Sequence, residues 1–302
     1  MAIKRLIRFD WAMKKLLRNK ANFEILEGFL SELLFEDIKI VKILESEGNQ
    51  ENALDKYNRV DILIENSKEE LIIVEVQNDT ELDYFQRILF GTSKLLMEYL
   101  DLGEEYAKLK KVISISIVYF DLGLGEDYIY HGKTSFYGLR RHDQLTLNAR
   151  QKTYLQKETV ESVFPEYYLI KPQSFDNQLR DSLDEWIYFF KNSDTPETIT
   201  AKGLAKAKQV LDVMQLPKAE QKKYQRYLED MSYQKSITET IKFEVKEEAE
   251  RIKNMIMEQG ARKREREIAL SLLKNQVPLE IIMNSTGLSL EEIEELRKEL
   301  GA

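Results

Sequence analysis

Residues 59–78 read RVDILIENSKEELIIVEVQN, two apolar runs separated by a polar segment. Each run predicts a β-strand, and the polar segment between them predicts the turn of a hairpin. A hairpin centred on Lys68 places Asp61 directly opposite Glu75, with Gln77 on the same face of the strand as Glu75. Because apolar residues surround both acids, we expect the two strands to be buried on both faces.

Two facing carboxylates need a positive group between them. Their side-chain bases would lie only about 4.5–5.5 Å apart, and like charges at that distance destabilise a sheet. A divalent cation would remove this repulsion, and Mg²⁺ commonly binds one or two carboxylates together with water and phosphate oxygens. The alternative is that Asp61 and Glu75 are ordinary acids at the ends of solvated strands.

The composition limits the kinds of site that this chain could form. Its 302 residues contain no cysteine and two histidines, His131 and His142. A disulfide framework and a cysteine-based zinc site are therefore excluded, and hard oxygen ligands remain. No run of about 18 apolar residues is present, and the N-terminus has no apolar signal core, so we expect a cytoplasmic protein with no membrane partner.

The charge is unevenly distributed. The formal net charge is −8, yet residues 1–20 hold seven Lys or Arg against one Asp. Such a patch is either a solvated face or a surface that attracts nucleic acid. The candidate nucleic-acid-binding residues are Lys4, Arg5, Arg8, Lys14, Lys15 and Arg18.

The spacing of apolar residues predicts the order of the other elements. Before the hairpin we expect helices over 9–17 and from 22, then a strand over 38–44. After it we expect a helix over 81–100, a strand over 112–120 and a short hairpin over 128–137. Beyond residue 175 the pattern is helical, with helices over 179–190, 201–214, 218–233 and 238–275, the last pausing at Gly260. We therefore expect two domains, residues 1–172 and 173–302.

A short helical hairpin is expected at 276–300. Pro278 begins one helix, Gly287 ends it, and Ser289 with Glu292 forms a capping box for the next. The pair resembles a helix-turn-helix motif, but its second helix is acidic, which opposes contact with phosphates. Packing or oligomerisation is the alternative to DNA reading, and we expect copies of the chain to assemble through the helical C-terminus.

These segments resemble the PD-(D/E)XK nuclease superfamily, and more narrowly the Rpn family of recombination-promoting nucleases, also described as PD-(D/E)XK nuclease family transposases. The resemblance runs through about residues 8–145. It rests on FDWAMKKLL, NFEILEGFLSELL, NRVD, LIIVEVQ, YFQRILFGTSK and KVISISIVYFD, and the ending NSTGLSLEEIEEL is also similar. It implies an α/β fold with a restriction-endonuclease-like αβββαβ core and a mixed sheet, followed by an all-helical C-terminal region. It also implies DNA endonuclease activity that depends on a divalent metal.

One position departs from the usual superfamily pattern, which has Lys where this chain has Gln77. An amide can orient water but cannot carry a positive charge or act as a base. Gln is itself typical of the Rpn-like branch. The missing cation could come from Lys14, Arg87 or Lys94, although solvent exposure is the alternative explanation for the last two.

The resulting hypothesis is a Mg²⁺-dependent endonuclease acting on DNA, with Mn²⁺ or Ca²⁺ as other possible ions. Asp61, Glu75 and the backbone carbonyl of Val76 would hold the ion, and Gln77 would orient the attacking water. Glu27, at the rim of its helix's apolar stripe, either helps a second ion or a water, or points to solvent. The alternatives are an inactive DNA-binding or oligomeric scaffold of the same fold, and an RNase or toxin.

Overall fold

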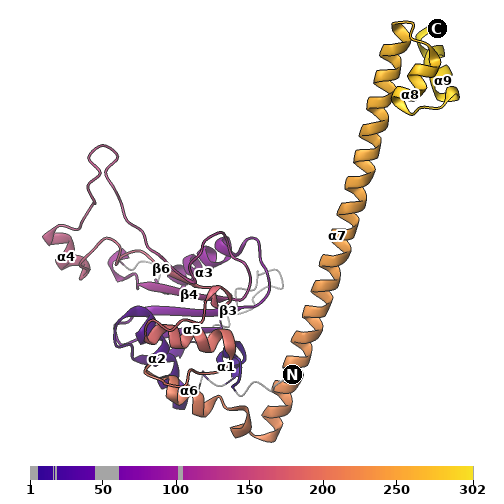
Figure 1. Ribbon diagram of the computed structural model, residues 1–302. Helices are drawn as coiled ribbons and strands as arrows, with labels where there is room; N and C mark the ends of the chain where they lie inside the picture. The colour runs from indigo at the N-terminus through magenta and orange to yellow at the C-terminus, as the bar shows by residue number, and fades with distance from the viewer. Residues whose placement is uncertain (1–5, 16, 18, 45–60, 101–104, 302) are drawn as a thin grey trace. The chain divides into compact units, whose positions relative to one another are not determined.

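The computed structural model describes residues 6–15, 17, 19–44, 61–100 and 105–301 (Figure 1). The chain divides into two compact units, Met1–Tyr224 and Gln225–Ala302. Helix α7 begins in the first unit and continues through most of the second. None of the described helices is long and apolar enough to cross a membrane.

The first unit is built on a six-stranded mixed sheet with the order β1-β2-β3-β4-β6-β5. Neighbouring strands are antiparallel from β1 to β3, parallel from β3 through β4 to β6, and antiparallel between β6 and β5. The bounds are β1 Ile40–Leu44, β2 Ile62–Asn66, β3 Leu71–Gln77, β4 Val112–Val118, β5 Ile129–Gly132 and β6 Glu166–Ile170.

Helices surround the sheet and continue beyond it. The bounds are α1 Phe9–Lys15, α2 Phe23–Leu34, α3 Tyr84–Glu98, α4 Ala149–Leu155, α5 Ser182–Asn192, α6 Leu204–Val210, α7 Lys218–Lys274, α8 Leu279–Thr286 and α9 Leu290–Gly301. Single-turn helices lie at Lys20–Asn22, Tyr106–Lys108, Pro172–Ser174 and Val213–Gln215. The order from α2 to β4 is αβββαβ, so the expected core and its mixed sheet are confirmed.

The β2–β3 hairpin has the register expected from the sequence, with Ile62 opposite Val74 and Leu63 opposite Ile73. Its turn is fixed by Asn66, whose Oδ1 accepts hydrogen bonds from the backbone N–H of Lys68 at 3.0 Å and of Glu70 at 2.9 Å. Every residue of β2 is buried, and so are the residues of β3 before its last. The hairpin is therefore a central element of the sheet.

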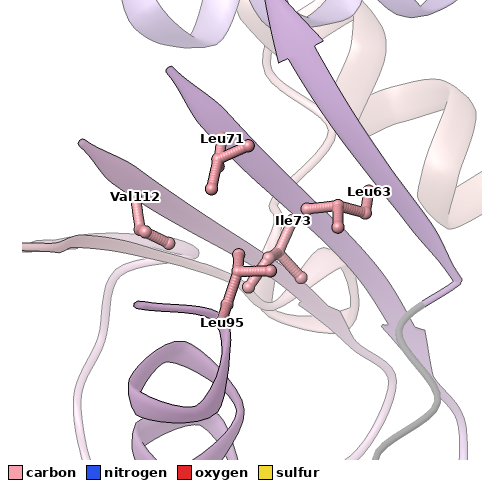
Figure 2. Packing of buried hydrophobic residues seen from close by; sticks show 5 residues of the cluster. All are labelled: Leu63, Leu71, Ile73, Leu95 and Val112. Atoms are coloured by element: carbon pink, nitrogen blue, oxygen red, sulfur yellow. The ribbon is translucent and has the colours of Figure 1, made fainter. Parts of the chain in front are cut away.

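Helix α3 crosses over from β3 to β4 and packs on these two strands and on the neighbouring β2 (Figure 2). Leu95 of α3 contacts a cluster formed by Leu63 of β2, Leu71 and Ile73 of β3, and Val112 of β4. In Figure 1 the sheet lies between α3 on one side and α2 and α5 on the other. This crossover makes β3 and β4 parallel, as the helical spacing between them predicts.

Helices α5 and α6 pack against α2 within the first unit. An aromatic cluster joins them to the N-terminus: Phe9 of α1 lies 4.4 Å from Phe190 between ring centroids, and Phe29 of α2 lies 5.7 Å from Trp186. The region after residue 172 thus supplies part of the core beneath the sheet.

A close approach of two glycines sets how tightly α2 and α6 pack. A Cβ on Gly28 would lie 2.2 Å from the carbonyl oxygen of Lys202, which also accepts a hydrogen bond from Trp186 Nε1 at 3.2 Å. Gly203 adopts a φ of 75°, and its Cβ would lie 2.6 Å from the carbonyl oxygen of Glu24. Both positions therefore require glycine.

Two expectations about local structure are wrong. Residues 128–137 do not form a hairpin, because β5 pairs instead with β6, more than thirty residues further along the chain. The two helices expected after residue 218 are one continuous helix, α7, of 57 residues, and Gly260 does not interrupt it. A single glycine costs a helix only about 1 kcal/mol, which the surrounding turns tolerate.

The glycine contact predicts the effect of adding one methyl group. Gly28→Ala should lower the free energy of unfolding of the first unit by at least about 2 kcal/mol, because the clash is with rigid backbone. Gly132→Ala is the control: its Cβ would make ordinary contact at 3.6 Å with Tyr167 and should change stability by less than about 0.5 kcal/mol. Urea unfolding followed by circular dichroism measures both, and equal effects would contradict the proposed contact.

Candidate functional site

Asp61 lies immediately before β2, half-buried, with its carboxylate turned toward β3. Its Oδ2 accepts a hydrogen bond from the backbone N–H of Val76 at 2.7 Å. Continuing the observed register by one residue places Asp61 opposite Glu75, so the two acids are neighbours across the hairpin.

Glu75 is a carboxyl group inside the sheet, with 6% of the residue exposed. Its Oε1 forms an ion pair with Arg87 Nη2, and its Oε2 accepts a hydrogen bond from the Tyr84 hydroxyl at 3.4 Å. Burial raises the pKa of Glu75; Arg87 opposes this effect, and the negative charges of Asp61 and Glu81 add to it. A buried acid with a perturbed pKa beside a second acid is characteristic of functional sites.

Arg87 supplies the positive charge that the buried acid needs. Besides its ion pair with Glu75, its Nη1 pairs with Glu81 Oε1 at 2.5 Å, and its guanidinium lies over the Tyr84 ring at 5.8 Å. Its Nε is buried and has no hydrogen-bond partner among the described residues. Lys94, by contrast, is half-exposed and pairs with Glu98 at 3.6 Å within α3. Arg87 is thus a cation suggested by the sequence that contacts Glu75 directly.

Gln77 ends β3 and lies beside the same acidic group. Its Nε2 donates to Glu81 Oε1 at 2.8 Å and to the backbone carbonyl of Asp79 at 3.3 Å. Glu81 therefore joins Gln77 to Arg87. Sequence reasoning missed the roles of Glu81 and Tyr84, although Tyr84 begins one of the segments that carry the family resemblance.

A second polar cluster adjoins the end of β3. Asp10, 2% exposed, accepts hydrogen bonds from Trp11 N at 2.8 Å and from Asn78 Nδ2 at 2.8 Å. Arg8 donates from Nε to Asp10 at 3.2 Å and from Nη2 to Asn78 at 2.9 Å. This cluster ties the N-terminal segment to the residue that follows Gln77, and the side chain of Arg8 takes part in internal contacts.

The other candidate residues lie elsewhere or outside the described structure. Glu27 accepts hydrogen bonds from Ile40 N at 2.9 Å and Lys39 Nζ at 3.2 Å, contacts that hold α2 to the first strand and involve neither Asp61 nor Glu75. Lys14 and Lys15 lie in α1. Lys4, Arg5 and Arg18 fall outside the described residues.

The donor set is compatible with a hard cation bound in part by water. Among the described residues, no three His, Asp or Glu side chains gather closely enough to hold a metal ion by themselves. Asp61 and Glu75 provide two carboxylates, and Mg²⁺ is commonly bound by one or two, with water and substrate phosphate completing its shell. With Glu81 the site carries three formal negative charges against the one of Arg87, which favours a cation.

The ion pair between Arg87 and Glu75 should be important for stability. Arg87→Met leaves a buried carboxylate without its partner and should lower the free energy of unfolding by about 3 kcal/mol. Adding Glu75→Gln should recover part of that loss, because the unpaired charge is removed. Lys94→Met, which breaks an exposed pair in the same helix, should cost less than about 0.5 kcal/mol. Urea unfolding of the parent and these three variants forms the test, and a loss no larger for Arg87→Met than for Lys94→Met would contradict it.

Comparison with known proteins gives one match. The family described as PD-(D/E)XK nuclease family transposase matches residues 7–242, which include the whole sheet and the site on it. A search of curated proteins found no match, and a search of solved structures found none either. Nucleases of this kind typically use divalent metal ions. With the αβββαβ core and the acids of its hairpin in place, the match shows that the chain belongs to the PD-(D/E)XK nuclease family transposases.

Proposed function

We propose that this protein is a metal-dependent DNA endonuclease that hydrolyses phosphodiester bonds, with a role in recombination or mobile DNA. The observation that carries the proposal is the pairing of Asp61 and Glu75 across the β2–β3 hairpin. One acid is half-buried and bonded to the backbone of β3, and the other is buried with a raised pKa. Family membership supports nuclease chemistry.

Asp61, Glu75 and the backbone carbonyl of Val76 would hold one Mg²⁺, with Mn²⁺ or Ca²⁺ as other candidates. When bound, such an ion lowers the pKa of a coordinated water and neutralises charge on a phosphate. In this arrangement the two carboxylates would position the ion. Asp61 is already oriented by its hydrogen bond from Val76 N, so less side-chain freedom is lost on binding.

Gln77 and Arg87 together would supply two functions of the lysine in related nucleases, orienting the water and providing a positive charge. The Gln77 amide, held by Glu81, can orient a water molecule through hydrogen bonds. Arg87 brings a permanent positive charge to the site, but it stays protonated at any physiological pH and therefore cannot act as a base. We infer that the proton of the attacking water leaves to solvent or to the substrate phosphate.

The nuclease assignment predicts the behaviour of three variants. Asp61→Asn and Glu75→Gln should each reduce Mg²⁺-dependent nicking of supercoiled DNA at least about 100-fold, because each removes a charged ligand. Glu69→Gln, an exposed acid in the turn of the same hairpin, should cleave like the parent. Cleavage that persists in both site variants, with purified protein free of contaminating nuclease, would contradict the assignment.

Metal binding separates the enzyme from a scaffold of the same fold. Calorimetric titration with Mn²⁺ should show binding to the parent protein and none to Asp61→Asn. DNA binding with neither metal binding nor cleavage would favour the inactive scaffold. Parallel assays on DNA and RNA of one sequence test the remaining alternative, an RNase or toxin, because no residue at the site visibly selects a 2′-hydroxyl.

The helical C-terminus is our proposed assembly region. Between residues 233 and 256 helix α7 carries a stripe of exposed apolar residues within a sector of about 140°, at 100° per residue. The stripe comprises Tyr233, Ile237, Ile241, Val245, Ile252, Met255 and Ile256, each between 37% and 66% exposed. Long helices are rarely stable without such a face being covered.

The distribution of charge along α7 favours a second copy of the chain, in antiparallel orientation, as the partner that covers the apolar stripe. Residues 225–250 hold four Lys or Arg and seven Asp or Glu, whereas residues 251–274 hold seven basic residues and three acidic ones. Antiparallel pairing therefore sets an acidic half against a basic half. At the end of α7 the acidic α9 pairs with basic residues, as in Arg266–Glu299 at 3.3 Å, so the helical hairpin packs on α7.

The stripe predicts how the oligomer responds to a single charge. Ile241→Asp should convert the protein to a monomer in light scattering coupled to size-exclusion chromatography, because an aspartate on the stripe cannot be buried without cost. Phe243→Asp is the matched control, since Phe243 is 61% exposed but lies on another face of the helix. A monomeric parent protein, or equal dissociation by both changes, would contradict the proposed interface.

A further inference from the structure

A second basic segment, exposed in the structure, lies outside both the candidate site and the N-terminal patch. Residues 133–157, which we call the basic arm, read KTSFYGLRRHDQLTLNARQKTYLQK and contain six Lys or Arg against one Asp, in a chain of net charge −8. Arg140, Arg141 and Arg150 are exposed and form no ion pair with any described residue. They differ in this from Arg8 and Arg87, whose guanidinium groups are engaged by acids.

The basic arm has a defined structure. Figure 1 shows the chain between β5 and α4 projecting from the sheet. A bridge joins Tyr137 to Gln144, Leu145 N donates to Phe136 O at 2.9 Å, and Gly138 N donates to Asp143 O at 2.8 Å. The arginine pair thus lies at the tip of a short ribbon, a turn whose two sides are joined by one antiparallel bridge. Helix α4 follows, begun by a capping box between Asn148 and Gln151.

The base of the arm is anchored in the first unit. Ser135 Oγ and Gln144 Nε2 both donate to Glu161 Oε1, which fastens the two strands of the ribbon to one carboxylate. The Phe136 ring packs on Phe164 at 5.4 Å. Lys111, 5% exposed, binds the carbonyl oxygen of Glu161 at 2.9 Å and the carboxylate of Glu166 at 2.9 Å. A charged tip held on a fixed base is preorganised for a partner.

We propose that the basic arm binds the phosphate backbone of duplex DNA at a distance from the cleaved bond. The arginine guanidinium presents a planar fork of donors that matches phosphate oxygens. Arg140 and Arg141 form no ion pair with any described residue that would stabilise the fold, so their donors are available to a partner. Leu139 at the tip is 96% exposed, and Tyr137 and Tyr154 are 64% and 66% exposed, which supplies apolar contact for sugars and bases. A two-stranded ribbon fits the major groove of B-DNA. The choice of DNA rests on the proposed function.

The topology separates the arm from the candidate site. Strand β5 runs antiparallel to β6 and ends with Gly132 opposite Tyr167, so the arm leaves the sheet where β6 begins. Gln77 lies opposite Val118, at the far end of β4. The seven residues of β4 span about 20 Å, roughly six base pairs of DNA. The arm therefore acts on substrate binding and leaves the chemical step unchanged.

The test removes two charges at the tip and two elsewhere. Arg140→Gln/Arg141→Gln is compared with Arg297→Gln/Lys298→Gln, an exposed adjacent pair in α9, outside the proposed α7 interface, that forms no ion pair with described residues. Binding to a fluorescent DNA duplex is measured by anisotropy in EDTA, in the Asp61→Asn background, across a range of salt. The arm variant should bind at least about tenfold more weakly, and the slope of log K against log salt should fall by about 2. The α9 pair should bind like its parent.

Each outcome decides the proposal. Unchanged binding by the arm variant, or an equal loss in the α9 pair, overturns it, and so does a loss seen only when an RNA duplex of the same sequence replaces the DNA. Because the tip residues are exposed, far-UV circular dichroism and the unfolding midpoint should match the parent. Because binding is measured in EDTA and in the Asp61→Asn background, the result does not depend on whether the protein is a nuclease. If the parent cleaves DNA, the arm variant should raise KM and leave kcat unchanged, a split that a merely structural role would not produce.

Discussion

The fold of the first unit depends on keeping one carboxyl group, that of Glu75, inside a sheet. A charge in that position is tolerated only if a partner of opposite sign reaches it, and Arg87 does so from α3. Arg87 can reach Glu75 because Leu95 of the same helix packs on Leu63 and Ile73, which fixes the crossover between β3 and β4. Packing and electrostatics thus specify the same position for α3. Asp61, Gln77 and Glu81 then fall around the paired group as a result of the hairpin register and the end of β3.

The basic residues of this chain fall into two groups that the sequence alone does not distinguish. Arg8, Arg87 and Lys111 are directed inward and bind carboxylates or carbonyls, so they hold elements together. Arg140 and Arg141 are exposed and form no ion pair with any described residue. A positive charge that is already paired attracts a polyanion weakly, whereas an unpaired one attracts it strongly. In this protein, therefore, the position of a basic residue in the fold carries more information than the density of basic residues in the sequence.

The parts of the structure that were predictable from the sequence are those fixed by local patterns. The alternation around Asp61 and Glu75 and the polar turn between them determine the hairpin register, and the helical spacing before β4 determines its parallel pairing. Pairing of β5 with β6 was not predictable, since the partner strand lies far along the chain. The same is true of Glu81 and of the Asp10–Asn78 contact, which tertiary packing creates. Composition suggested Arg8 as a nucleic-acid contact, and it could not reveal that Asp10 and Asn78 bind its side chain.

The aromatic cluster beneath the sheet has a consequence for how the protein is made. Phe9 and Phe29 are almost fully buried, and Trp186 and Phe190 of α5 supply much of that cover. During translation the strands bearing the two facing acids leave the ribosome more than one hundred residues before α5 does. Until then the early helices expose large apolar rings to water, and the hairpin lacks its supporting layer. A nascent chain therefore lacks this cover until α5 and α6 have emerged, so unfinished chains are expected to be unstable and prone to aggregation.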